Sequence, residues 1–85
     1  MDFEKVNDQT MEGVVGGISQ DEALAAALKH VGLEKTQLDY IKEIELDWER
    51  GRKIYEISFF KDGFEYEFDI DAASGRILKF EKDRD

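Results

Sequence analysis

The chain contains no cysteine. Disulfide bonds are therefore excluded, and no thiolate is available as a nucleophile or as a metal ligand. A cytosolic and an exported protein both fit this absence. A chain of 85 residues is a single domain by length. It buries only roughly 60 to 65% of its unfolded surface. Its free energy of unfolding should therefore be on the order of 5 kcal/mol. The core must be small, with the aromatic residues as its largest components.

The chain also lacks a long apolar run. None approaches the ~20 residues that a membrane-spanning helix requires, so we expect no direct membrane insertion. The first residues, MDFEKVNDQTMEGVVGG, are acidic and lack the basic and apolar regions of a signal peptide. Residues 1–17 show no sustained period and predict a flexible tail or linker, with a short strand around Val14 and Val15 as the alternative.

Basic residues are outnumbered, 12 against 21 acidic ones, which gives a formal net charge of −9. A phosphate backbone or an anionic membrane surface would be repelled, so nucleic acid is not an expected partner. A basic protein, a basic peptide or a cation would be attracted. Solubility alone is the alternative explanation of this charge.

The segment ISQDEALAAALKHVG predicts one helix. Ser19 at the N-cap and Glu22 three residues later form a capping box, and Gly32 ends the helix. The apolar stripe of this helix recurs at helical spacing. Its members are Leu24, Ala27, Leu28 and Val31.

From about residue 42 the apolar period changes to two, which predicts β-strands. KEIELDWE, KIYEISFFK and residues 64–71 form three strands, joined by a turn at Arg50–Arg52 and by the Asp62-Gly63 hairpin signal. Residues 76–81 predict a last strand, and residues 82–85 a charged tail. Short turns between strands imply an antiparallel meander of three to four strands. The prediction is a two-layer α+β domain over residues 18–81, with one N-terminal helix on one face of the sheet.

The order and spacing of these motifs resemble the PepSY domain over about residues 18–81. The matching residues are Ile18-Ser19, Glu22-Ala23 through Ala27-Leu28, Gly32, Asp47, Tyr55-Glu56-Ile57, Asp62-Gly63, Glu65-Tyr66, Asp69-Ile70-Asp71-Ala72 and Ser74-Gly75-Arg76-Ile77-Leu78. PepSY-like domains occur, often in tandem, in propeptides of thermolysin-type metallopeptidases and in many secreted or membrane-anchored bacterial proteins. The resemblance implies an exported, non-enzymatic module that inhibits or regulates a peptidase, with its export signal outside this chain.

Alternating acids raise the question of a metal site. An EF-hand loop starting at Asp69 would need Gly at its sixth place and Glu at its twelfth, where this chain has Ser74 and Phe80. We therefore expect no metal and no cofactor, with a weak, irregular cation site as the alternative. Asp71 and Ser74 are expected to shape the turn through bonds to local backbone.

Catalytic groups are equally scarce. His30 is the one histidine, and its place in the last helical turn is explained by the helix dipole. A general acid/base pair needs a carboxylate with a raised pKa in a closed pocket, which acids on an open sheet face lack. Ser19 is a cap, Ser58 lies in a strand and Ser74 in a turn, with no base nearby in sequence. We expect no enzymatic activity.

Acids of three predicted strands share one sheet face with Ile54 and Phe60, and Ile77 is a further candidate for this face. This face is either a docking surface for a cationic or mixed protein surface, with an exposed Phe60 as apolar anchor, or a solvated face with Phe60 covered by the tail or a second copy. An edge strand could also accept an extended peptide or pair with another copy. The candidate protein-binding residues are Glu45, Asp47, Ile54, Glu56, Phe60, Glu65 and Glu67.

The sequence and the resemblance together favour a protein-interaction module that regulates or inhibits an extracytoplasmic peptidase. The alternative is a structural or sensory module of a larger bacterial envelope protein. Either role needs a protein partner and no catalytic residues.

Overall fold

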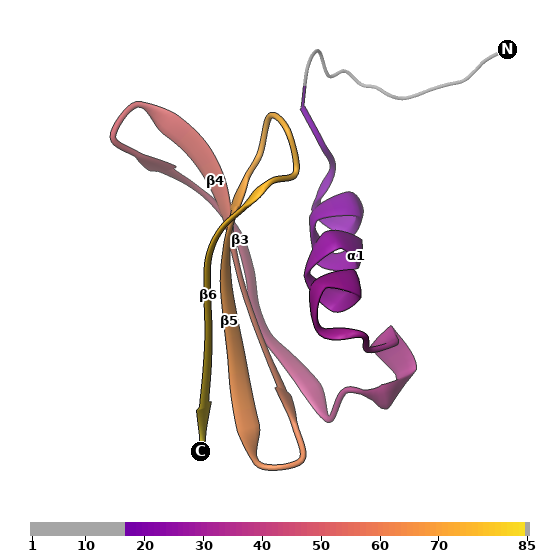
Figure 1. The fold of residues 1–85 in the computed structure, drawn as a ribbon. Coiled ribbons are helices and arrows are strands. Elements are labelled where there is room, and N and C mark those ends of the chain that lie inside the picture. Colours follow the sequence, from indigo (N-terminus) through magenta and orange to yellow (C-terminus); the bar gives the residue numbers. More distant parts are fainter. Residues whose placement is uncertain (1–16, 85) are drawn as a thin grey trace, which may run out of the picture.

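The computed structural model describes residues 17–84. One helix is followed by a sheet of four antiparallel strands in the order β3-β4-β5-β6, which confirms the predicted α+β fold (Figure 1). Residues 1–16, with the alternative strand at Val14 and Val15, lie outside the described residues. The elements are α1 (Gln20–Val31), the short 3-10 helix η1 (Lys35–Gln37), β3 (Tyr40–Glu49), β4 (Arg52–Lys61), β5 (Phe64–Asp71) and β6 (Ile77–Arg84).

Both ends of α1 follow the local sequence. The Ser19 hydroxyl accepts a hydrogen bond from the Glu22 N–H at 3.0 Å, and the Glu22 carboxylate accepts one from the Ser19 N–H at 2.8 Å. This reciprocal pair is the predicted capping box. At the other end Gly32 adopts φ 70°, and its N–H returns to the carbonyls of the last turn. The predicted helix and its two caps are confirmed.

Two-residue turns join β3 to β4 and β4 to β5. Arg50 and Gly51 have φ of 55° and 77°, and Asp62 and Gly63 have φ of 54° and 81°. Left-handed conformations at both central residues match the right-handed twist of paired strands, so such turns hold hairpins tightly. The Asp62-Gly63 signal therefore marked a real hairpin.

The core lies between α1 and one face of the central strands. Ala23 and Ala27 are fully buried, so their small side chains let the helix approach the sheet closely, while Phe59 and Phe68 fill the space beneath. Figure 1 shows α1 against one side of the sheet only. The buried cluster is Ala23, Leu24, Ala27, Leu28, Tyr55, Ile57, Phe59, Tyr66, Phe68, Ile70 and Ala72.

The outer strands differ in places from the sequence prediction. β6 continues to Arg84, so residues 82–84 belong to the sheet and not to a charged tail. The register between β5 and β6 shifts between Asp69 and Ile70. As a result Ile77, which the sequence left as a further member of the acidic side, packs against the core under α1.

α1 is too short to cover the full length of the strands, because its 12 residues span about 18 Å and the 10 residues of β3 span about 33 Å. Leu46 and Trp48 of β3 alternate with acids as predicted, yet they are 49% and 64% exposed.

Within residues 17–84, no helix has both the length and the apolar character needed to cross a membrane.

Candidate functional site

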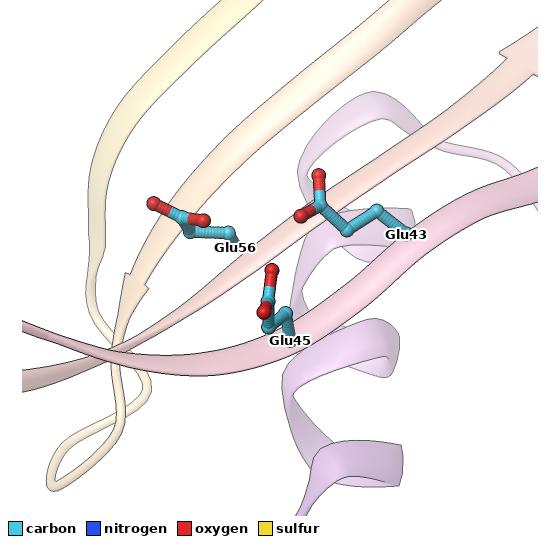
Figure 2. Close-up of side chains that lie close together, drawn as sticks. All are labelled: Glu43, Glu45 and Glu56. Carbon is cyan, nitrogen blue, oxygen red and sulfur yellow. The ribbon is translucent and has the colours of Figure 1, made fainter.

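The face of the sheet opposite α1, called the open face below, collects acids from neighbouring strands. Glu56 of β4 is paired in register with Glu45 of β3 on one side and with Asp69 of β5 on the other. Three acids thus lie in one row across three strands. Figure 2 shows the side chains of Glu43, Glu45 and Glu56 close together on this face, with α1 behind the sheet.

Crowding of acids and desolvation raise the pKa of two acids on this part of the open face, Glu43 and Glu56. The neighbouring carboxyl of Glu45, which shares a hydrogen bond with Glu43, raises the pKa of Glu43, and desolvation adds to the shift. Desolvation, followed by the charges of Asp47 and Asp69, raises the pKa of Glu56. Both shifts mean that the folded protein carries these negative charges at a free-energy cost.

The β5–β6 half of the open face continues the pattern. Glu67 is paired with Glu81, and Glu65 with Asp83. The hydrogen bond that Glu67 shares with Glu65, together with desolvation, raises the pKa of Glu67. The open face is therefore acidic across all four strands of the sheet.

Glu65 has two compensating partners on this face. Its Oε2 accepts hydrogen bonds from the Ser58 hydroxyl at 3.0 Å and from Lys42 Nζ at 3.2 Å. These two bonds lower the pKa of Glu65. Glu65 and Ser58 are thus held in place by the fold.

A shallow hollow of about 160 Å³ lies in the middle of the open face. Ser58 lies within it and is almost fully buried, and Lys79 of β6 is the one basic residue that reaches it. The hollow is lined by Glu43, Glu56, Ile57, Ser58, Glu67, Phe68, Asp69 and Lys79.

The expectation that Phe60 is exposed is wrong. Phe60 is only 8% exposed, because the ring of Tyr40, its register partner on β3, stacks on it at 4.7 Å with an interplanar angle of 17°. Ile54 is buried as well, at 2% exposure. Neither side chain is accessible as an anchor, and the exposed aromatic residue at this end of the open face is Tyr40, at 57%.

The remaining candidate residues are brought together as predicted by strand alternation. Glu45 and Asp47 lie on β3, Glu56 on β4, and Glu65 and Glu67 on β5. Sequence reasoning missed the exposed pair Leu46 and Trp48 on the other side of β3. Their apolar character suggested burial, and only the short length of α1 could have indicated otherwise.

Other polar residues have structural partners. The ring of His30 makes edge contacts with Phe68 and Phe80, at centroid distances of 6.2 and 5.1 Å. The Asp71 carboxylate accepts a hydrogen bond from the Ala73 N–H, and the Ser74 hydroxyl accepts one from the Arg76 N–H. The predicted turn-shaping role of Asp71 and Ser74 is confirmed.

Within residues 17–84, two groups of carboxylates are close enough to share a cation by geometry. Each group has ligand atoms within 4.8 Å of one another, and neither contains Asp69, Asp71 or Ser74. Exposed acids commonly gather in this way without a metal, so the geometry alone assigns no metal function. The groups are Glu43, Glu45 and Glu56, and Glu67, Glu81 and Asp83.

Comparison with known proteins gives a family and one informative relative. The family model described as "Peptidase propeptide and YPEB domain" matches residues 17–81. An uncharacterized protein of Streptococcus pyogenes serotype M6 is 33% identical over 79 residues, which cover 93% of this chain and 58% of the relative. The chain thus spans little more than half the length of that relative. No solved structure matches the chain significantly.

Proposed function

The chain belongs to the PepSY family, and from that premise we propose that it is a non-enzymatic protein-interaction module that regulates or inhibits a peptidase outside the cytoplasm. The family description links such domains to peptidase propeptides. The surface that we assign to the interaction is the open face.

One observation carries the choice of the open face. Glu45, Glu56 and Asp69 lie in register across three strands, although like charges opposite one another destabilise a sheet. Folding alone gives no reason to retain this row, and functional surfaces often cost stability. A basic side chain of a partner would relieve the repulsion and would bind by charge complementarity.

The mode of regulation that fits this surface is docking. The acids guide the approach of a basic patch on the peptidase and fix its orientation, while the rigid hairpins hold them in place. Docking near the active-site cleft would obstruct substrate. Because the contact is electrostatic, added salt should weaken it.

The test measures hydrolysis of a short fluorogenic peptide by a thermolysin-type metallopeptidase in the presence of this protein. The wild type should reduce the rate, and the double variant Glu45→Gln/Glu56→Gln should be a weaker inhibitor. Asp21→Asn/Glu34→Gln removes the same charge from exposed positions outside the sheet and should inhibit like the wild type. An undiminished rate with the wild type would remove this peptidase class as a partner.

The second candidate function is a structural or sensory module within a larger envelope protein. The length of the streptococcal relative, of which this chain covers 58%, favours it, since the same unit there accompanies further sequence. Binding of another protein without any change in peptidase rate would support this second function.

A further inference from the structure

The outer edge of β3 presents backbone groups that β4 does not use. β3 is the first strand in the order β3-β4-β5-β6 and pairs only with β4. The Ile44 carbonyl accepts a hydrogen bond from the Gln20 side chain at 3.3 Å, and the Trp48 N–H donates to the Asp47 carboxylate at 2.8 Å. Both groups are therefore directed away from β4.

Backbone groups of an antiparallel strand alternate between the partner strand and the outside. Leu46 lies midway between Ile44 and Trp48, so its N–H and C=O also face outward. Among residues 17–84, no side chain caps Leu46 in the way that Gln20 and Asp47 cap its neighbours. The stretch from Ile44 to Trp48 is thus an open edge whose outward groups at both ends bond only to solvent-exposed side chains.

The side chains along this edge fall into two rows of different chemistry. On the α1 side, Leu46 and Trp48 are 49% and 64% exposed, and Lys53 Nζ lies 5.4 Å from the Trp48 ring centroid. On the open face, β3 presents only acids between residues 43 and 49, namely Glu43, Glu45, Asp47 and Glu49. A strand laid beside β3 would face apolar groups on one side and negative charge on the other.

We propose that the outer edge of β3 binds an extended peptide segment with alternating basic and apolar residues, which adds a further strand to the sheet. The peptide backbone bonds to the outward groups around Leu46. Its apolar side chains cover Leu46 and Trp48, and its basic side chains lie beside Glu45 and Asp47. This inference rests on the proposed function, because it names the form and chemistry of the partner segment.

The acids of β3 disfavour a second copy of this chain as the strand that binds at this edge. Edge strands are commonly protected against such pairing by charged residues. Pairing β3 with another β3 would place its acids against the same acids, between molecules that each carry a net charge of −9. The acids thus block self-pairing and leave the edge open to a basic strand.

The test uses three capped seven-residue peptides and the intact chain. The first alternates lysine and valine, and the second replaces every lysine with glutamate. The third is the first with N-methyl groups on alternate residues, which removes one edge of backbone donors and keeps the charge. Trp48 is the one tryptophan in the chain, so its fluorescence reports binding at β3, and amide NMR shifts locate it.

We expect the lysine peptide to change Trp48 fluorescence and to shift the Leu46 and Trp48 amides. The N-methylated peptide should bind at least about tenfold more weakly, because it loses several hydrogen bonds together and each is worth about two- to tenfold in affinity. The glutamate peptide should not bind. Equal binding of the methylated peptide, shifts confined to Glu67 and Asp69, or no binding would each overturn the inference.

A pair of proline variants tests the direction of the backbone groups. Leu46→Pro removes an outward N–H, which an edge strand tolerates, whereas Glu45→Pro removes an inward N–H that pairs with β4. Leu46→Pro should fold and lose peptide affinity, and Glu45→Pro should melt at a lower temperature. If Leu46→Pro does not fold, the Leu46 N–H does not point away from β4. The comparison of the lysine peptide with its N-methylated form then tests strand addition without this variant.

Two further outcomes separate this inference from its premise. Concentration-dependent dimerisation that buries Trp48 would overturn the inference in favour of a second copy. The wild type could fail to bind the peptides while Leu46→Pro still inhibits the peptidase. That result would overturn peptide binding at the outer edge of β3 and leave the function proposed for the open face intact.

Discussion

Glu56 and Glu65 lie on neighbouring strands of the same face, yet their pKa values move in opposite directions. Burial beside other acids raises the pKa of Glu56. Hydrogen bonds from Ser58 and Lys42 lower the pKa of Glu65. The difference is one of partners, because Glu65 has two donors and Glu56 has acids as its cross-strand neighbours on both sides.

Neutral isosteres at these two positions should therefore change stability with opposite signs. Glu56→Gln should raise the free energy of unfolding at neutral pH and low salt by a few tenths of a kcal/mol, allowing for solvent screening. Glu65→Gln should lower it. Urea unfolding measures both, and a shift of the same sign in the two variants would contradict this account of the open face.

Burial separates the aromatic residues into those that hold the fold and those that do not. Phe60→Ala should cost about 2 to 4 kcal/mol, because Phe60 is buried beneath Tyr40. Trp48→Ala should change stability by no more than about 0.5 kcal/mol, since Trp48 is 64% exposed. Thermal melting compares them; equal losses would mean that Trp48 is part of the core.

At the scale of elements, the helix and its ends were predictable because their signals are local. Ser19 and Glu22 bond to each other, and Gly32 adopts the left-handed conformation that its position requires. The hairpin at Asp62-Gly63 is equally local. No distant part of the chain is needed to specify these features.

Features that depend on distant residues were not predictable. Alternation placed Leu46 and Trp48 on the α1 side of the sheet, but their exposure depends on how far α1 extends over β3. Phe60 is buried because the register sets Tyr40 opposite it. The shift in strand register beside Ile70 turns Ile77 toward the core. The alternation of apolar and polar residues in the sequence does not indicate where such a shift occurs.

The cap of α1 provides a prediction at this scale. Ser19→Ala removes the acceptor for the Glu22 N–H and should lower the free energy of unfolding by about 1 kcal/mol. Ser19→Thr keeps a hydroxyl and should remain close to the wild type. Chemical denaturation compares the three proteins, and an unchanged midpoint for Ser19→Ala would show that the cap adds nothing to stability.

For the whole molecule, the open face predicts an unusual dependence of stability on pH. Glu43, Glu56 and Glu67 have raised pKa values, so the folded state takes up protons at a higher pH than the unfolded state does. Their destabilising effect is present at neutral pH and is lost as the pH falls through the raised values. Stability should therefore increase as the pH falls from neutral toward the ordinary carboxylate range.

The opposite trend begins at lower pH. Glu65 and Asp71 have lowered pKa values, through bonds to Ser58 and Lys42 and to the Ala73 backbone respectively. Their stabilising effect is present above the usual carboxylate range and is lost as the pH falls through the lowered values. Urea midpoints at low salt should pass through a maximum in the ordinary carboxylate range, at about pH 4 to 4.5. A steady fall from neutral pH downward would contradict the prediction.

Docking of a protein partner on the open face is best tested by an amide NMR titration with a thermolysin-type metallopeptidase whose activity is followed in parallel. Such docking should give shifts clustered around Glu45, Glu56 and Glu67, weakened by salt and by Glu45→Gln/Glu56→Gln, together with a falling rate of hydrolysis. Shifts confined to the exposed side of α1, or inhibition that the double variant leaves unchanged, would contradict it.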